Sequence, residues 1–307
     1  MNRVATANSY SSALSDLMRA QVRQQLASDQ VASGKAATDL KGFAGKAEAL
    51  LATRSLQTRT QGFIDQGRTL VSRLQSQEMA LTQTMDAAAG ARQAISEALA
   101  AGRGDSLMSE LSSWFSSAAD ALNARFGGRY LFAGGQVDTP PVNVATLADI
   151  TTPPAVADLF QNDGLAPASR LDESTTVESG FLADAVGTDL FDAFRQVQAW
   201  VDANGDFTGP LDAAEEAFLS GIVGAFDAAR SGLTDDAARN GTLQSRVDKT
   251  LETQEARLSM LTGMVGDMTD VDMADAISRL QQAQTAVQAS AQVFAQLSES
   301  SLLNLLR

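Results

Sequence analysis

The sequence contains neither cysteine nor histidine among its 307 residues. Disulfides, thiolate nucleophiles, zinc sites built from Cys and His, and Ser-His-Asp triads are therefore excluded. Carboxylate or lysine chemistry remains available in principle, but no constellation of such residues supports an enzyme. The missing cysteine fits a secreted protein made without disulfides, and it fits a cytosolic protein equally well.

Basic residues are also scarce. The chain has 23 Lys and Arg against 37 Asp and Glu, which gives a net charge of −14. Nucleic acids and anionic membrane surfaces are disfavoured as partners, because both require a basic face. No apolar run approaches the roughly 20 residues that span a bilayer. The first residues, MNRVAT, lack the apolar stretch of a cleaved signal peptide. We expect no membrane partner and no small-molecule substrate.

Proline is absent before Pro140, and this absence permits long helices in the first part of the chain. Apolar residues at helical spacing predict one helix over about 44–99 and a second that is capped at Asp105 or Ser106 and stops at Gly127. Periodicity returns over 190–201, 211–229 and 235–264. The positions that define the first helix are Leu70, Leu74, Leu81 and Ile95.

Five of the six prolines lie between residues 129 and 180, where Thr, Val and Asp are frequent. This composition predicts short strands and loops. The fold class we predict is mainly α: a long helical coiled coil or bundle formed by the N- and C-terminal segments, with a small β-rich or irregular inserted outer domain. Trp114 and Phe115 are predicted to be core aromatics.

The two ends of the chain share an unusual pattern. Met273, Leu280, Val287 and Phe294 are spaced by seven, and the positions four residues after them hold Ile277, Gln284, Ala291 and Ser298. This spacing is typical of a coiled coil with a weak second position. Between Arg279 and Glu299 no residue is charged, and glutamines take the place of Lys and Glu. A helix without charges suits burial on several sides.

We therefore predict that both termini form one helical hairpin or coiled coil that polymerises. The alternative is a C-terminal helix packed into its own domain. The predicted assembly interface comprises Leu14, Leu17, Met18, Val22, Leu26, Met273, Ile277, Leu280, Val287, Ala291, Phe294, Leu297, Leu302, Leu303, Leu305 and Leu306.

Three other patterns resemble sites. The segment beginning at Asp202, DANGDFT, resembles the start of an EF-hand, but Phe207 and Ala213 occupy the positions that need Gly and Glu. We interpret it as a polar loop, with Gly209 near a helix N-cap and Pro210 at the first helical position. The paired glycines at 127–128 and 134–135 lack the context of a nucleotide site. The acidic pair at 235–236 is interpreted as a helix N-terminus. We expect no metal and no cofactor.

Several motifs together resemble the flagellin and hook-associated protein 3 family, over about residues 1–135 and 235–307. None is specific alone, but they occur in the family's order. The matching segments are SGK at 33–35, GRYLFAGG at 128–135, ARNG at 238–241, RVD at 246–248, DMADAI at 272–277, QAS at 288–290 and SLL at 301–303. Residues 36–42, AATDLKG, depart from the family, which usually has a Pro-containing turn there.

The resemblance implies a secreted structural subunit of the bacterial flagellum, exported by the flagellar type III route, with termini that are disordered before assembly. The partners implied are copies of the chain, hook-associated proteins, flagellin and an export chaperone. Residues 128–135 favour the hook–filament junction, whereas the ending LLNLLR favours filament flagellin. A secreted coiled-coil effector or adhesin is a further alternative.

The resemblance also implies a division of the chain. Residues 1–42 and 269–307 form an inner helical core domain, and residues 43–135 and 183–268 form a second helical domain. Residues 136–182 form the inserted outer domain.

Overall fold

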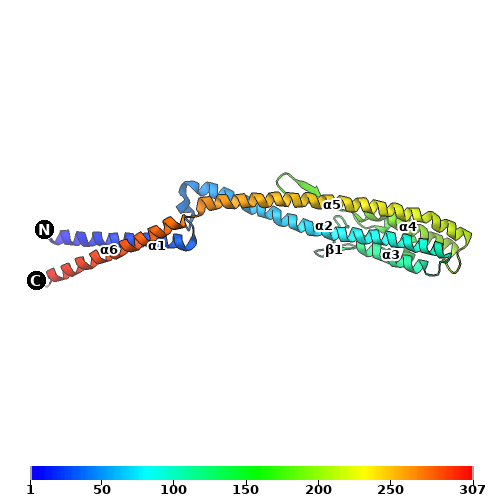
Figure 1. The fold of residues 1–307 in the computed structure, drawn as a ribbon, viewed down its shortest axis with the longest axis horizontal. Coiled ribbons are helices and arrows are strands. Elements are labelled where there is room, and N and C mark those ends of the chain that lie inside the picture. Colours follow the sequence, from blue (N-terminus) through cyan, green and yellow to red (C-terminus); the bar gives the residue numbers. More distant parts are fainter. Residues whose placement is uncertain (1, 306–307) are drawn as a thin grey trace. The chain divides into compact units, whose positions relative to one another are not determined.

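The computed structural model describes the backbone of residues 2–305, and the side chains of all of these except residues 2–7, Ala44 and 298–305. The described chain is mainly helical, as predicted. Its α-helices are α1 (Asn2–Ser33), α2 (Ala47–Ala101), α3 (Leu107–Leu122), α4 (Ala183–Asn204), α5 (Ala213–Thr269) and α6 (Met273–Leu305) (Figure 1). Three short 3-10 helices span Leu40–Lys46, Leu147–Thr151 and Val156–Leu159.

The chain divides into two compact units. The terminal unit comprises residues 1–59 and 257–307, and the central unit comprises residues 60–256. Both boundaries cut through the long helices α2 and α5, so the units do not follow the predicted division of the chain. That division stays a prediction.

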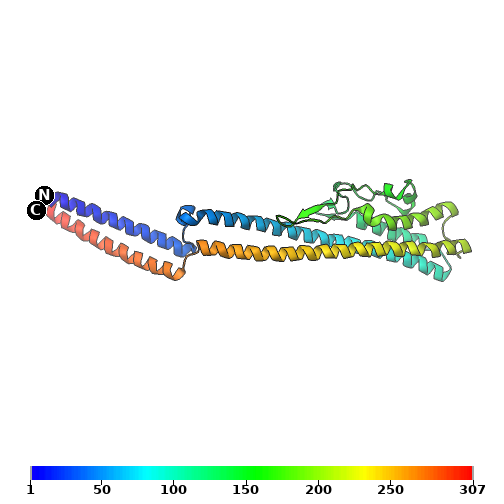
Figure 2. The same ribbon diagram turned by 90° about the horizontal axis from the view of Figure 1, so that it is seen from above.

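In the central unit, α2 and α5 lie side by side (Figure 2). The α5 positions spaced by seven, including Phe226, Leu233 and Val247, are all buried. Leu74, Leu81 and Ile95 provide the matching repeat on α2, and each is fully buried. A repeat of seven keeps one seam of each helix against its partner over many turns, which explains why both helices are long and uninterrupted. The pairs Arg68–Glu255 and Arg92–Asp227, both 2.7 Å apart, flank the seam.

Helices α3 and α4 complete the core of the central unit around a cluster of phenylalanines. The ring of Phe115 on α3 meets Phe191 and Phe194 on α4 edge to face, at centroid distances of 5.3 and 5.6 Å. Phe194 meets Phe226 of α5 in the same manner at 5.1 Å. The prediction that Phe115 is a core aromatic is confirmed. The neighbouring Trp114 is partly buried and packs against this core.

The insert between α3 and α4 has short strands and loops, as predicted. Strand β1 (Arg125–Phe126) pairs antiparallel with β2 (Arg129–Tyr130), and β3 (Ala168–Arg170) pairs antiparallel with β4 (Thr176–Glu178). The turn of the second hairpin is held by Asp172, whose carboxylate accepts hydrogen bonds from the backbone and hydroxyl of Ser174 and from the backbone of Thr175. These bonds lower the pKa of Asp172 to about 2.

The insert does not fold around a separate core. Leu147, Ile150 and Leu159 join the same hydrophobic cluster as α3 and α4. The second hairpin packs on the α2–α5 pair, where Leu171 and Val177 contact a cluster that includes Leu74 and Val247.

Three predictions about helix ends are wrong. Helix α3 ends at Leu122, before β1, and not at Gly127. Helix α5 is continuous through residues 230–234, so the acidic pair at 235–236 lies inside the helix instead of at its N-terminus. Burial raises the pKa of Asp236, and Arg239 at 3.1 Å opposes this shift. The predicted break was misplaced because the buried seam on both sides of residues 230–234 holds the helix together.

The start of α5 also differs from the prediction that Gly209 and Pro210 begin the helix. Asp212 caps it instead: its Oδ1 accepts hydrogen bonds from the backbone nitrogens of Ala214 and Glu215, both at 2.8 Å. Glu215 in turn accepts a hydrogen bond from the nitrogen of Asp212 at 2.7 Å, which makes a reciprocal cap. The backbone nitrogen of Gly209 instead donates to a carboxylate oxygen of Asp105, in the turn before α3, at 2.9 Å.

Gly90 on α2 offers a test of how tightly the central unit is packed. A Cβ at this position would lie 2.2 Å from Cε2 of Trp114. We expect Gly90→Ala to lower the free energy of unfolding by about 1–3 kcal/mol, because the indole and α3 would have to move. Urea denaturation followed by circular dichroism measures the change.

Gly62→Ala is the matched control, because Gly62 lies on the same helix and a Cβ there meets no atom within 4 Å. This control should gain up to about 1 kcal/mol from the better helix propensity of alanine. Equal stabilisation by both substitutions would contradict the close packing of Trp114 on α2.

Candidate assembly interface

Within the terminal unit, α1 and α6 pair along their length (Figures 1 and 2). The facing positions of α6 follow a repeat of three and four residues through Ala276, Leu280, Ala283, Val287, Ser290, Phe294 and Leu297. On α1 the facing positions include Leu17, Ala20, Gln24, Ala27 and Val31. Near the N-terminal end of α1, the ring of Tyr10 lies 4.8 Å from the ring of Phe294.

This pair buries little apolar surface. Among residues 8–33 and 273–297, the fully buried hydrophobic side chains are Ala20, Ala27 and Ala276. Alanines let two helices approach closely but remove little area from water. The pair therefore has much less hydrophobic stabilisation than α2 and α5. The disorder of the termini before assembly, which the family resemblance implies, stays a prediction.

Part of the predicted seam on α6 lies against α1 within the chain. Leu280, Val287, Phe294 and Leu297 face α1 and are partly buried. The second row lies three residues after the first, at Ala283 and Ser290, and not four residues after it. Ile277, Gln284 and Ala291 are exposed, as is Met273. The row formed by Ala283 and Ser290 was not evident in the sequence, because its residues are small and face the alanines of α1.

The predicted residues of α1 divide in the same way. Leu14 and Leu17 are partly buried, whereas Met18, Val22 and Leu26 are 56–59% exposed. These last three residues, spaced by four, form a stripe on one side of the helix that we call the outer stripe. Side chains of this size are seldom left in water in a row, and such a surface marks an interaction site. The predicted residues Leu302, Leu303, Leu305 and Leu306 lie outside the described side chains.

Missed by the sequence prediction were Ala20, Ala27 and Ala276, the most deeply buried residues of the pair. A spacing of seven residues could have revealed them: Ala20 and Ala27 are seven residues apart, as are Ala276 and Ala283. Alanine is too common in this chain for that spacing to stand out.

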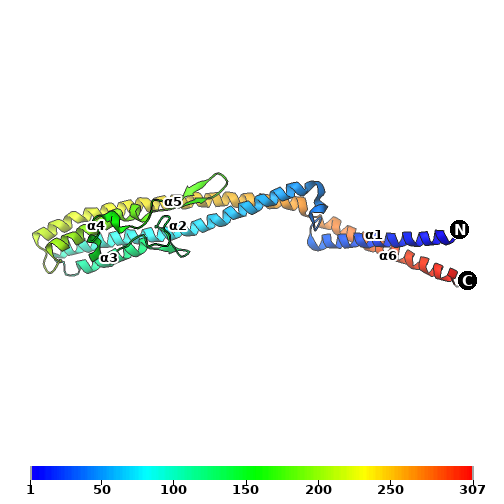
Figure 3. The same ribbon diagram turned by 180° about the vertical axis from the view of Figure 1, so that it is seen from behind.

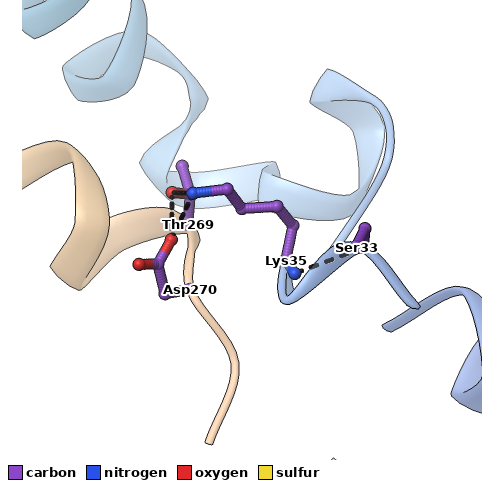
Figure 4. A network of polar contacts seen from close by, with 4 residues as sticks. All are labelled: Ser33, Lys35, Thr269 and Asp270. Atoms are coloured by element: carbon purple, nitrogen blue, oxygen red, sulfur yellow. Dashed lines mark hydrogen bonds and ion pairs between the residues drawn. The ribbon is translucent and has the colours of Figure 1, made fainter. Parts of the chain in front are cut away.

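The two passages of the chain between α1 and α2 and between α5 and α6 are joined to each other (Figure 4). The nitrogen of Ala36 donates to the carbonyl of Thr269 at 2.7 Å, and the nitrogen of Val271 donates to the carbonyl of Gly34 at 3.0 Å. Lys35 donates from Nζ to Oδ1 of Asp270 at 2.5 Å and to the hydroxyl of Thr269 at 3.3 Å. We call this group the 35–270 clamp.

Gly34 makes the clamp possible, because its φ of +68° turns the chain in a region that disfavours side chains with a Cβ. The SGK motif therefore has a structural role here: the serine ends α1, the glycine turns the chain, and the lysine bonds the returning segment. The departure of residues 36–42 from the family pattern leaves this turn intact.

The EF-hand-like segment is engaged in structural bonds. Asp202 accepts hydrogen bonds from the hydroxyl of Thr151 at 2.7 Å and from Nε2 of Gln198 at 2.8 Å, and these bonds lower its pKa. Within the described part of the chain, no group of three or more acidic side chains is arranged to hold a metal. No described helix is both long enough and apolar enough to span a bilayer.

Comparison with known proteins confirms the resemblance to the flagellin and hook-associated protein 3 family. Residues 223–306, which include most of α5 and all of α6, match the family described as the bacterial flagellin C-terminal helical region. No curated protein sequence matches the chain.

Two solved structures share the fold. The first is described as a flagellar hook-associated protein from Vibrio parahaemolyticus; it has 16% identity and a TM-score of 0.59, and the match covers 72% of this chain and 96% of that one. The second is FlgL of Bacillus cereus, with 15% identity and a TM-score of 0.52, and the match covers 72% and 99% of the two chains.

The 35–270 clamp should depend on the charge of Asp270. The hydrogen bond from Lys35 is the main cause that lowers the pKa of this carboxyl. A carboxylate with a depressed pKa contributes fully above the ordinary value of about 3.9, and its contribution is lost as the pH falls through the lower value of the folded state. We therefore expect the amides of Ala36 and Val271 to be protected from hydrogen exchange at neutral pH.

Asp270→Asn should reduce that protection at neutral pH, whereas Asp267→Asn, an exposed position one turn earlier on α5, should leave it unchanged. Hydrogen exchange read by mass spectrometry on the 33–42 and 265–273 peptides distinguishes the two variants. Undiminished protection in Asp270→Asn would mean that the backbone bonds alone hold the clamp.

Proposed function

We propose that this chain is a non-enzymatic structural subunit of the bacterial flagellum, similar to hook-associated protein 3, which assembles at the hook–filament junction through α1 and α6. One observation carries the proposal: the match to the flagellin C-terminal helical region falls on α6, and the helix paired with α6 exposes the outer stripe. A helix pair that buries alanines and exposes larger side chains is suited to packing against other helices.

Assembly would cover the outer stripe. Complete burial of a fully exposed Met, Val or Leu contributes about 1.5–3 kcal/mol, and these side chains, which are 56–59% exposed, can gain roughly half of that each. Met273 and Ile277 on α6 are 42% and 44% exposed and offer further apolar area. The same interface includes Leu302, Leu303, Leu305 and Leu306 as a prediction from the sequence.

The proposal places the protein in the extracellular flagellum, after export by the flagellar route. Its partners there are copies of the chain, other hook-associated proteins and flagellin, and an export chaperone is expected inside the cell. The sequence features that support this are the uncharged, glutamine-rich faces of the terminal helices and the ordered family motifs.

The second candidate is flagellin itself, as a major or minor filament subunit. The match to the flagellin C-terminal region is compatible with both. The segment GRYLFAGG at 128–135 and the shared fold with two structures described as hook-associated proteins favour the junction. The flagellin match also disfavours an unrelated coiled-coil effector or adhesin.

Val22 tests the interface. We expect Val22→Asp to abolish incorporation into flagella while the helix content and melting temperature of the monomer stay near wild type. The reason is that Val22 is 59% exposed in the single chain, so the carboxylate is desolvated only in the polymer. Gln21→Asp introduces the same charge one residue earlier, at an exposed position outside the outer stripe, and should still assemble.

Phe294→Asp extends the test to the inner face. It should also prevent assembly and leave the central unit folded, but it should loosen the contact with Tyr10 in the monomer as well. Normal incorporation of Val22→Asp would exclude the outer stripe from the interface.

The location is tested by immunogold labelling of intact flagella with an antibody against the purified protein. A single band at the distal end of the hook is expected. Uniform decoration along the filament would favour flagellin instead, and absence of label from flagella of an expressing strain would refute both candidates.

A further inference from the structure

The central unit contains a cavity of about 520 Å³ between α2, the β1–β2 hairpin and the insert. Strand β1 and helix α2 are labelled in Figure 1, and Figure 3 shows α2 from behind. The volume falls in the range of ligand pockets. Most of the lining is apolar or aromatic, and two arginines are the charged groups among the lining residues. These residues are Gln66, Thr69, Leu70, Arg73, Phe126, Arg129, Tyr130, Leu131, Gly134, Val137, Leu165, Pro167 and Ser169.

Arg73 is the unusual member of this lining. It is partly buried on α2, and among the described residues it has neither an ion pair nor a hydrogen bond from its side chain. Burial without a counter-charge lowers the pKa of its guanidinium. In a chain with 37 acidic residues, a half-buried arginine without a carboxylate partner is unexpected. Other arginines on the long helices, such as Arg68 and Arg92, do have such partners.

The hairpin adds a second cation and an aromatic wall. Arg129 is exposed on β2 and also lacks a described partner, so it can follow an incoming anion. Tyr130, which is 8% exposed, is fixed by Arg125, whose guanidinium lies 4.1 Å from the centre of the tyrosine ring and donates to its hydroxyl. The guanidinium of Arg125 is therefore already bound to Tyr130, whereas those of Arg73 and Arg129 are available to bind an anion.

Asp163, two residues before the lining residue Leu165, already accepts two hydrogen bonds from the backbone. Asp163 accepts hydrogen bonds from the nitrogens of Gly135 at 2.7 Å and of Leu165 at 3.0 Å through the same oxygen. Its role is to hold the loop that forms the rim. The counter-charge for Arg73 must therefore come from outside this loop.

We propose that this cavity binds an Asp or Glu side chain, together with its apolar neighbours, from a second copy of the chain. The guanidinium of Arg73 in the lining can hold one carboxylate through two parallel hydrogen bonds. The apolar wall formed by Leu70, Phe126 and Leu165 suits the flanking side chains of a peptide segment. A polyanion would find only two arginines among the lining residues. The chain's net charge of −14 would also repel it.

The choice of a second copy rests on the proposed function, because assembly brings copies together and each copy carries an excess of acidic residues. The binding of a carboxylate by Arg73 does not rest on it. Two experiments separate these parts.

The first experiment uses benzoate as a probe, with benzamide as its uncharged counterpart. Titration of the full chain, followed by heteronuclear NMR, should show saturable shifts around Arg73 and Tyr130 with benzoate but not with benzamide. Arg73→Gln should weaken benzoate binding by roughly tenfold or more, which is typical for loss of a charged hydrogen-bond partner. Because its unpaired charge is removed, Arg73→Gln should fold normally. Equal binding by Arg73→Gln, or none by the wild type, would overturn the proposal.

The second experiment identifies the source of the carboxylate. Arg73→Lys places an amine in the cavity, and a carbodiimide joins an amine directly to a carboxylate in contact with it. Polymerised protein made from equal amounts of ¹⁴N- and ¹⁵N-labelled chains should give a cross-link from position 73 to an acidic peptide of the other isotope. Arg68→Lys is the positive control for a link within one chain, because Arg68 lies 2.7 Å from Glu255.

Arg246→Lys is the background control, since Arg246 is an exposed position on α5 without a described partner. A link from position 73 that is confined to one chain, or one no more frequent than that from position 246, would overturn the second copy as occupant. Failure of the chain to polymerise would count against the proposed function, while the benzoate titration would still decide whether Arg73 binds a carboxylate.

Discussion

The seven-residue repeat that packs α2 against α5 is the constraint on which the rest of the described structure depends. A straight helix drifts out of register with such a repeat, so two helices that keep it must stay together over many turns. Leu74, Leu81 and Ile95 on one helix and Phe226, Leu233 and Val247 on the other remain buried because both sequences maintain the repeat. Helices α3 and α4 and the insert then cover one end of this pair through the phenylalanine cluster.

Polar residues inside this seam fix which turns of the two helices meet. Asn240 is fully buried, and its Nδ2 donates to the carbonyl of Leu74 at 2.9 Å. Gln77, one turn further along α2, is also fully buried, and its amide has no partner among the described residues. A shift of one helix by a turn would break the bond from Asn240 to Leu74, so Asn240 favours one register, whereas the unpaired amide of Gln77 is a cost in stability.

The sequence predicted the fold class well because the strongest signals were long and repeated. Three features indicated the secondary structure directly. They are the proline-free stretches, the helical spacing of Leu70, Leu74, Leu81 and Ile95, and the proline-rich insert. The failures came from signals that several turns of packing override. The acidic pair at 235–236 suggested a helix boundary, but Leu233 and Asn240 belong to the same buried row, so the helix continues. The cap at Asp212 was missed because Pro210 suggested an earlier start.

The sequence directed attention to the two terminal helices, but it did not show which of their faces meet within the chain. Large apolar residues attract attention in a sequence, yet in the α1–α6 pair they are divided between two faces. The inner face uses Ala20, Ala27 and Ala276, which let the backbones approach, and the outer face retains Met18, Val22 and Leu26. A helix pair that satisfied its own hydrophobic residues would be stable alone and would have little reason to associate. Because Met18, Val22 and Leu26 lie on the side of α1 away from the buried alanines, the hydrophobic free energy of these three side chains is left for the assembly proposed above. The same division explains why α2 and α5, whose seam holds leucine and phenylalanine, can fold within one chain.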